Sequence, residues 1–93
     1  MVIGLCEITL RLPGVLSLKA KRSLLKSLIA RLRQRFNVSV AEVDEHDKWQ
    51  LSVIAVACVS TDSAQAHRLL EQVLHFAERD TQIQVIQSSS QIF

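Results

Sequence analysis

The 93-residue chain is poor in the residues from which most recognisable catalytic loops are built. It has two glycines, Gly4 and Gly14, one proline and no tyrosine. A phosphate-binding P-loop, a dinucleotide-binding fingerprint and the nucleophile elbow of hydrolases each need glycines at fixed spacing, and none of these motifs is present. The sequence therefore predicts a protein that is not an enzyme, with no catalytic residue and no cofactor.

Aromatic residues and cysteines are almost as scarce. With three phenylalanines and one tryptophan, the chain lacks both the RRM signature and the aromatic residues on which an RRM stacks RNA bases. Trp49 stands alone beside an acidic segment, and we expect it to close one end of the core. Cys6 and Cys58 lie in apolar segments without metal-ligand spacing, which predicts two free, buried thiols.

Long apolar runs are also missing. No stretch approaches the ~18 apolar residues of a membrane span. The first ten residues carry neither a basic segment nor a small-residue cleavage site. The length suits one small core and is too short for two. We therefore expect a single cytoplasmic domain over residues 1–93 that does not contact a membrane.

What the sequence does have is a strong separation of charge. Positions 11–35 carry eight Lys and Arg residues and no acid, whereas Glu42–Asp47 carries four acids in six residues. Most of the cations fall in the segment Ser17–Phe36, where leucines recur at helical spacing and Ser17 is suited to cap the helix. A set of these cations forms our candidate nucleic-acid or anion site: Lys19, Lys21, Arg22, Lys26 and Arg33. A surface that only keeps the protein soluble would carry the same charges.

The remaining pattern predicts four strands and a second helix. Alternating apolar residues indicate strands over 2–12, 38–44, 49–59 and 81–87, and Asp62 begins a helix that extends to about residue 79. The compact solution for this order is an α+β, ferredoxin-like βαββαβ fold, with a four-stranded antiparallel sheet and two helices on one face. We expect residues 88–93 to form a flexible tail.

The sheet face away from the helices is predicted to carry an apolar patch. Such a patch usually marks an interface, so we expect a homodimer that covers it, or failing that the Ile92-Phe93 tail. The predicted interface residues are Ile3, Leu5, Ile54, Val56 and Ile86.

Two clusters contain metal-ligating residue types without the spacing of a metal site. The acidic segment 42–47 lacks the glycine of an EF-hand loop, and a charged turn is the simpler interpretation. His67, Glu71 and His75 spread over more than two helical turns, which favours a solvated helix face. We predict no metal site. Glu42 lies within a predicted strand, where an acid is expected to pair with Lys or Arg.

Several segments together resemble the YlxP-like family of small bacterial proteins, a domain of unknown function. The most specific are SLKAKR at 17–22, NVSVAE at 37–42 and Trp49, and the resemblance covers about residues 1–87. It implies a ferredoxin-like fold and a protein located in the bacterial cytoplasm. It also implies a gene that in many genomes stands among those for translation initiation and ribosome maturation. The family supplies no catalytic residues to carry over.

We therefore expect a non-enzymatic cytoplasmic binding module that contacts RNA or a ribosomal particle through its basic first helix. The alternative is a homodimeric protein–protein adaptor with no nucleic-acid role, whose charges only steer the partner. In that case the partner would dock on a ridge of small and polar helix residues: Ser23, Ser27, Ala30 and Gln34. No small-molecule substrate is evident from the sequence.

Overall fold

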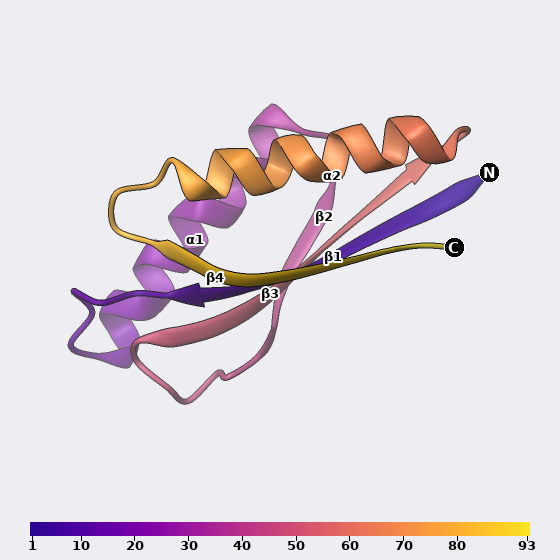
Figure 1. The fold of residues 1–93 in the computed structure, drawn as a ribbon. Helices are drawn as coiled ribbons and strands as arrows, with labels where there is room; N and C mark the ends of the chain where they lie inside the picture. The colour runs from indigo at the N-terminus through magenta and orange to yellow at the C-terminus, as the bar shows by residue number, and fades with distance from the viewer.

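The structure, a computed structural model, describes all 93 residues and has the predicted element order (Figure 1). The four strands form one antiparallel sheet in the order β2-β3-β1-β4, and both helices cover the same face of it. The ferredoxin-like prediction is confirmed. The elements are β1 (Val2–Arg11), α1 (Leu18–Arg35), β2 (Ser39–Asp44), β3 (Leu51–Ser60), α2 (Ser63–Glu78) and β4 (Gln84–Ile92).

One core of sixteen buried apolar residues lies between the sheet and the two helices. The central strands β1 and β3 contribute alternate residues, and each helix contributes one stripe. At Gly4 the packing is close. A Cβ there would lie 3.0 Å from Cys58 Sγ and 3.1 Å from Leu70 Cδ1, so the missing side chain lets α2 approach β1. Cys6 and Cys58 are free and buried, as predicted.

The two helices cover different parts of the sheet. α1 packs on β2, the strand at one edge, and α2 packs on β1, β3 and the opposite edge strand β4. As predicted, Ser17 caps α1: its hydroxyl accepts a hydrogen bond from the Ala20 N–H at 3.0 Å. Neither helix combines the length and apolar character needed to cross a membrane.

The predicted face of two β3 residues is wrong. Ile54 and Val56 are fully buried beneath the helices, because they pair with Ile8 and Cys6 on the core side of β1. Residues paired across an antiparallel ladder share a face of the sheet. Ile3 and Ile86 are 40 % and 44 % exposed. Of the predicted patch, Ile3, Leu5 and Ile86 are therefore the residues with exposed surface.

The predicted flexible tail is also wrong. Residues 88–92 belong to β4, which pairs with β1 as far as Ile92 opposite Gly4. Beyond that pair, Phe93 and Ile3 exchange backbone hydrogen bonds of 2.8 and 3.0 Å. The chain's last residues therefore complete an edge of the sheet, and both termini lie at the same end of the molecule (Figure 1).

Trp49 does not close the core. It lies before β3 with half of its surface exposed. The segment between β1 and α1 fills that end of the core instead, with Leu12 and Val15 both buried. Gln50 holds this segment in place, because its backbone carbonyl accepts from the Leu12 N–H and its side-chain amide donates to the Val15 carbonyl, both at 3.0 Å.

Candidate nucleic-acid interface

Three of the predicted cations form an exposed stripe along α1. Lys19, Arg22 and Lys26 stand at i, i+3 and i+7, which places them on one side of the helix, and all three are exposed. None of them takes part in a salt bridge. Like charges at such spacing destabilise a helix by about 0.2–0.5 kcal/mol per pair, and α1 has no acid that would offset this. We call these three residues the basic stripe.

A groove of about 500 Å³ runs beside the stripe, between α1 and β2. Arg22, Lys26 and Arg33 are the cations that line it. Its remaining lining is mainly apolar and contains no aromatic residue: Leu25, Ile29, Ala30, Val40, Ala41 and Glu42. Arg33 is exposed, and its guanidinium donates to the Val40 carbonyl at 2.8 Å, so it also ties α1 to β2.

Lys21 is not part of this surface, and its prediction as an anion-binding residue is wrong. Its side chain is only 1 % exposed, and its Nζ lies 3.0 Å from Glu42 Oε2. The same Nζ donates to the backbone carbonyls of Glu45 and of His46. A buried ammonium with one carboxylate and two carbonyls is saturated, so it has no donor left for a phosphate.

Glu42 is the only acid that borders the groove, and its charge is compensated from inside the protein. Besides the ion pair with Lys21, its Oε2 accepts a hydrogen bond of 2.7 Å from the buried Ser52 hydroxyl. The predicted pairing of Glu42 with a cation is confirmed. Because Lys21 neutralises Glu42, the open side of the groove is electropositive.

Comparison with known proteins gives the family of this chain and leaves its activity open. The family described as "Protein of unknown function (DUF503)" matches residues 3–90. The chain belongs to this family. The Uncharacterized protein YlxP of Bacillus subtilis (strain 168) is 34 % identical over 83 residues, which cover 89 % of this chain and 90 % of that protein. This agrees with the resemblance predicted from the sequence, and neither description names a ligand.

In this member of the family, the turn after β2 holds the remaining acids away from the groove. Glu45 adopts a left-handed backbone conformation with φ of 62°, and its carboxylate lies 2.8 Å from Lys48 Nζ. The hydrogen bond and the negative charge of Glu45, with a further contribution from Asp44, raise the pKa of Lys48 above its ordinary value. The acidic segment is therefore partly neutralised by its own lysine, in line with the charged turn that we predicted.

The other cations of α1 are engaged within the protein. Arg31 Nη2 lies 2.9 Å from Asp80 Oδ2, which ties α1 to the loop before β4. Burial raises the pKa of Asp80, but the Arg31 hydrogen bond, the Gln82 N–H and the Arg31 charge outweigh it, and the pKa lies below its ordinary value. Arg35 lies over the rings of Phe36 and Phe76, at 5.9 and 5.7 Å.

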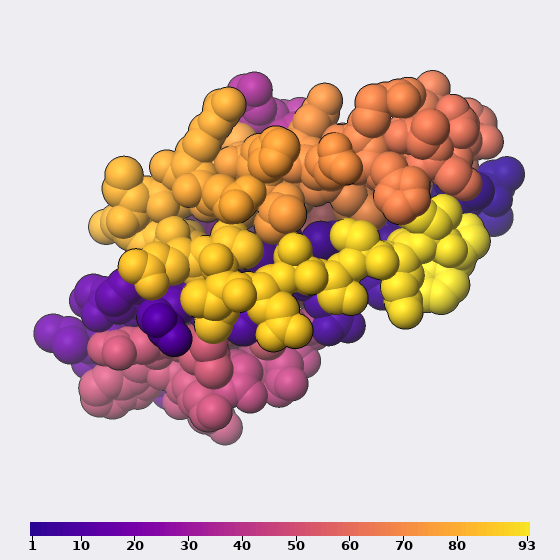
Figure 2. All heavy atoms as spheres, viewed as in Figure 1, coloured from indigo at the N-terminus to yellow at the C-terminus, as the bar shows by residue number.

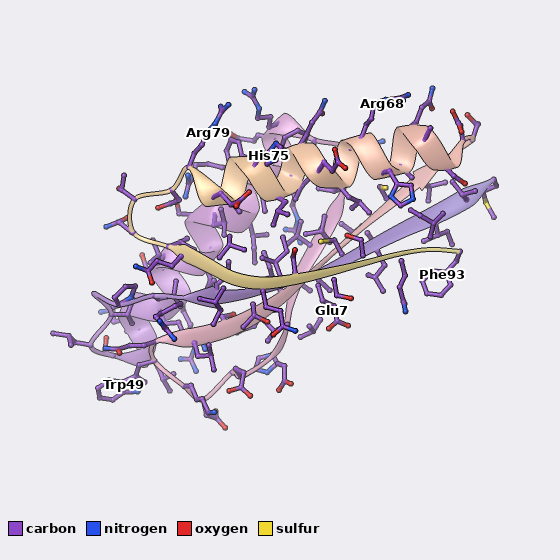
Figure 3. All side chains as sticks on the ribbon, in the orientation of Figure 1. Glu7, Trp49, Arg68, His75, Arg79 and Phe93 are labelled. Atoms are coloured by element: carbon purple, nitrogen blue, oxygen red, sulfur yellow. The ribbon has the colours of Figure 1, made fainter.

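On α2, no metal centre is assembled. His67, Glu71 and His75 are all exposed, and no three His, Cys, Asp or Glu side chains gather anywhere at metal-binding distance. Arg68 and Arg79 extend from the outer side of α2 into solvent (Figure 3). These two arginines are separate from the basic stripe, and they provide matched control positions.

Sequence reasoning missed the groove and the inward direction of Lys21. The groove could not be foreseen, because its width depends on how α1 lies over β2. Lys21 did carry a signal: it stands at i, i+4, i+7 and i+11 with Leu25, Leu28 and Leu32, the buried residues of α1. A cation in register with a buried stripe predicts an internal ion pair, and Glu42 is the partner it finds.

Proposed function

We propose that this protein binds RNA through the basic stripe of α1, and that a ribosomal particle is the first RNA-containing partner to test. One observation carries the proposal: Lys19, Arg22 and Lys26 lie exposed on a helix without acids, and no carboxylate of the protein pairs with them. The association of YlxP-like genes with translation genes favours the ribosomal partner.

Lysine and arginine bind phosphates mainly by releasing the cations condensed on the nucleic acid, so the affinity falls as salt rises. If three or four cations each meet a phosphate, the log–log salt slope for single-stranded RNA is about −2 to −3. Raising the salt from about 50 to about 200 mM should then weaken binding about 20- to 50-fold. A protein partner docked on the apolar part of α1 would respond far less.

Recognition of this kind depends on the backbone and shape of the RNA more than on its bases. Neither the stripe nor the groove contains an aromatic side chain on which a base could stack. The groove beside the stripe is instead lined by aliphatic side chains, together with the cations Arg22 and Lys26. We therefore expect modest sequence preference and strong salt dependence.

The test uses two triple variants that each remove three positive charges. Lys19→Ala, Arg22→Ala and Lys26→Ala together erase the stripe. The matched control, Arg11→Ala, Arg68→Ala and Arg79→Ala, removes exposed cations that lie elsewhere and form no salt bridge. Lys21 and Arg33 stay unchanged in both, because their contacts hold β2 against α1.

Each protein is mixed with purified ribosomal particles and sedimented in about 50 mM and about 200 mM salt. We expect the wild type and the control to sediment with the particles in low salt, and the stripe variant to stay in the supernatant. An equal loss of sedimentation in both variants would show that net charge and not the stripe is responsible, and a stripe variant that sediments like the wild type would overturn the proposal. If the wild type sediments regardless of salt, docking is not led by phosphates, and the adaptor function replaces the proposal.

A further inference from the structure

The edge strand β4 has a register shift opposite Thr9 and Leu10, but from Gln87 to Ile92 it lacks the other features that protect most sheet edges. It has nine residues, none of which is charged and none of which is proline. Figure 2 shows it running uncovered across the molecule, and seven of its nine residues are exposed. Proteins usually protect an exposed edge with charges, prolines or a very short strand, because its free N–H and C=O groups can pair with another strand.

The ladder with β1 tells which backbone groups of β4 are free. Ile3 and Phe93 exchange two hydrogen bonds, and in an antiparallel ladder such pairs alternate with pairs that are not hydrogen-bonded. Ile92 lies opposite Gly4 and Ser90 lies opposite Cys6, and both belong to the pairs that are not hydrogen-bonded, so their N–H and C=O groups turn away from β1. The outward-pointing residues are Ser88, Ser90 and Ile92.

We propose that two copies of this chain join their β4 strands antiparallel, about a twofold axis that passes beside Ser90. In this register Ser90 pairs with its own copy, and Ser88 pairs with Ile92 of the other copy in both directions. All three outward residues are then satisfied by about six backbone hydrogen bonds. The two four-stranded sheets become one sheet of eight strands. This interface goes beyond the RNA-binding proposal and does not depend on it.

The composition of β4 suits a second copy better than an unrelated strand. At a twofold axis the central residue faces its own copy, so a charged residue there would face the same charge. In the proposed register Ser90 faces Ser90, Ser89 faces Gln91 and Ser88 faces Ile92, and none of these residues is charged. On the open face of the sheet, Ile3 and Phe93 lie beside this edge, 40 % and 66 % exposed. Figure 3 shows Phe93 at the end of β4, where a paired strand would partly cover it.

This arrangement leaves the basic stripe free. α1 packs on β2, and β2 and β4 are the opposite edges of the sheet. The dimer therefore carries its two α1 helices at the outer ends of the extended sheet.

The first test measures the mass of the full chain by analytical ultracentrifugation from about 1 to about 100 μM. We expect a dimer that Ser90→Lys converts to a monomer, because two ammonium groups then face each other at the axis. The control Ser39→Lys places the same charge at an exposed position on β2 and leaves the dimer intact. Mixing Ser90→Lys with Ser90→Glu should restore a dimer at least about tenfold tighter than either variant forms alone.

A wild-type protein that stays monomeric at about 100 μM would overturn the proposal. So would a dimer that Ser90→Lys and Ser39→Lys affect equally. Amide hydrogen exchange of the wild type provides a test that needs no variant. The N–H groups of Ser88, Ser90 and Ile92 should exchange at least about tenfold more slowly in the dimer. Exchange at these groups that does not change with protein concentration would contradict the proposed register.

Discussion

The two edges of the sheet are built in opposite ways. β2 has six residues, among them Glu42 and Asp44, and two side chains of α1 reach across to hold it. β4 has nine residues without a charge, and no side-chain hydrogen bond or salt bridge ties the strand itself to a helix. One edge strand is therefore charged and tied to α1 by Lys21 and Arg33, whereas the other is uncharged, is held mainly by backbone pairing and remains available to another strand.

This difference separates the two proposed activities of the molecule. At β2, the internal ion pair uses up the charge of Glu42, so the cations of α1 that remain exposed face solvent without a competing acid. At β4, the absence of charge permits pairing between identical strands. RNA binding and self-association are thus assigned to opposite sides of the sheet, and each can be removed without the other.

The largest loss of stability is expected from Lys21→Met, which removes the ion pair between α1 and β2. The change leaves the Glu42 carboxylate, 18 % exposed, and two carbonyl groups without their cation. Removing one partner of a buried ion pair typically costs about 3–5 kcal/mol. Urea unfolding should show a loss near the lower end of that range, because Glu42 keeps some water and the Ser52 hydroxyl.

Two further variants give this prediction its controls. Lys26→Met removes an exposed cation one turn away and should change stability by less than about 0.5 kcal/mol. Adding Glu42→Gln to Lys21→Met should recover part of the loss, because no buried charge is then left unpaired. A Lys21→Met protein as stable as the Lys26→Met protein would show that the ion pair between Lys21 and Glu42 contributes nothing to the stability of the fold.

A smaller effect is expected from shortening the opposite edge. Deletion of residues 88–93 removes the half of β4 that pairs with Gly4, Cys6 and Ile8, together with the half-buried Ile92. We expect a loss of about 2–3 kcal/mol in urea unfolding, from several lost backbone hydrogen bonds and the burial of one apolar side chain.

The comparison for this deletion is the full-length variant Ser89→Ala with Gln91→Ala, which changes two exposed side chains and keeps the ladder. Its stability should stay within about 0.5 kcal/mol of the wild type. The measurements belong at a protein concentration too low for dimers, since association would add to the apparent stability. If the shortened chain is as stable as the full chain, residues 88–93 are a tail after all.

The sequence predicted the elements and their order well because both helices have continuous apolar stripes and clear caps. It could not orient β3. That strand is apolar on both sides, so its period of two does not tell which set, Ile54 and Val56 or Val53 and Ala55, faces the helices. The extent of β4 was missed for a related reason. Serines and glutamines are not among the residues enriched in strands, so the strand over 88–92 is set by pairing with the central strand β1.

The candidate site was only partly predictable, because part of it depends on contacts between segments that are far apart in the sequence. Helical spacing alone places Lys19, Arg22 and Lys26 on one exposed flank of α1. The register of Lys21 with the buried leucines indicates that its side chain turns inward, but it does not tell which groups the ammonium meets there. Those groups are the carboxylate of Glu42 and the carbonyls of the turn after β2, which only the tertiary structure brings together.

The smallest effect is expected at Asp80, whose pair with Arg31 is the one charged tie on the β4 side of α1. Asp80→Asn should cost about 1 kcal/mol at neutral pH, because Arg31 is 41 % exposed and water screens the pair. The pKa of Asp80 in the folded protein lies below its ordinary value of 3.8. Its ionised form therefore stabilises the fold fully above that ordinary value, and this contribution is lost as the pH falls through the lower, folded-state pKa.

The stability difference between wild type and Asp80→Asn should thus be constant from about pH 6 to 8 and shrink below about pH 4. Urea unfolding of both proteins along this pH range measures it, with Glu78→Gln as the control for an exposed acid at the end of α2. A difference that persists at about pH 2 would mean that the cost of Asp80→Asn comes from the new amide group and not from the lost charge, because asparagine still offers an oxygen to the Gln82 N–H. In that case the ion pair of Arg31 with Asp80 would not stabilise the β4 side, and the buried pair of Lys21 with Glu42 on the β2 side would have no counterpart there.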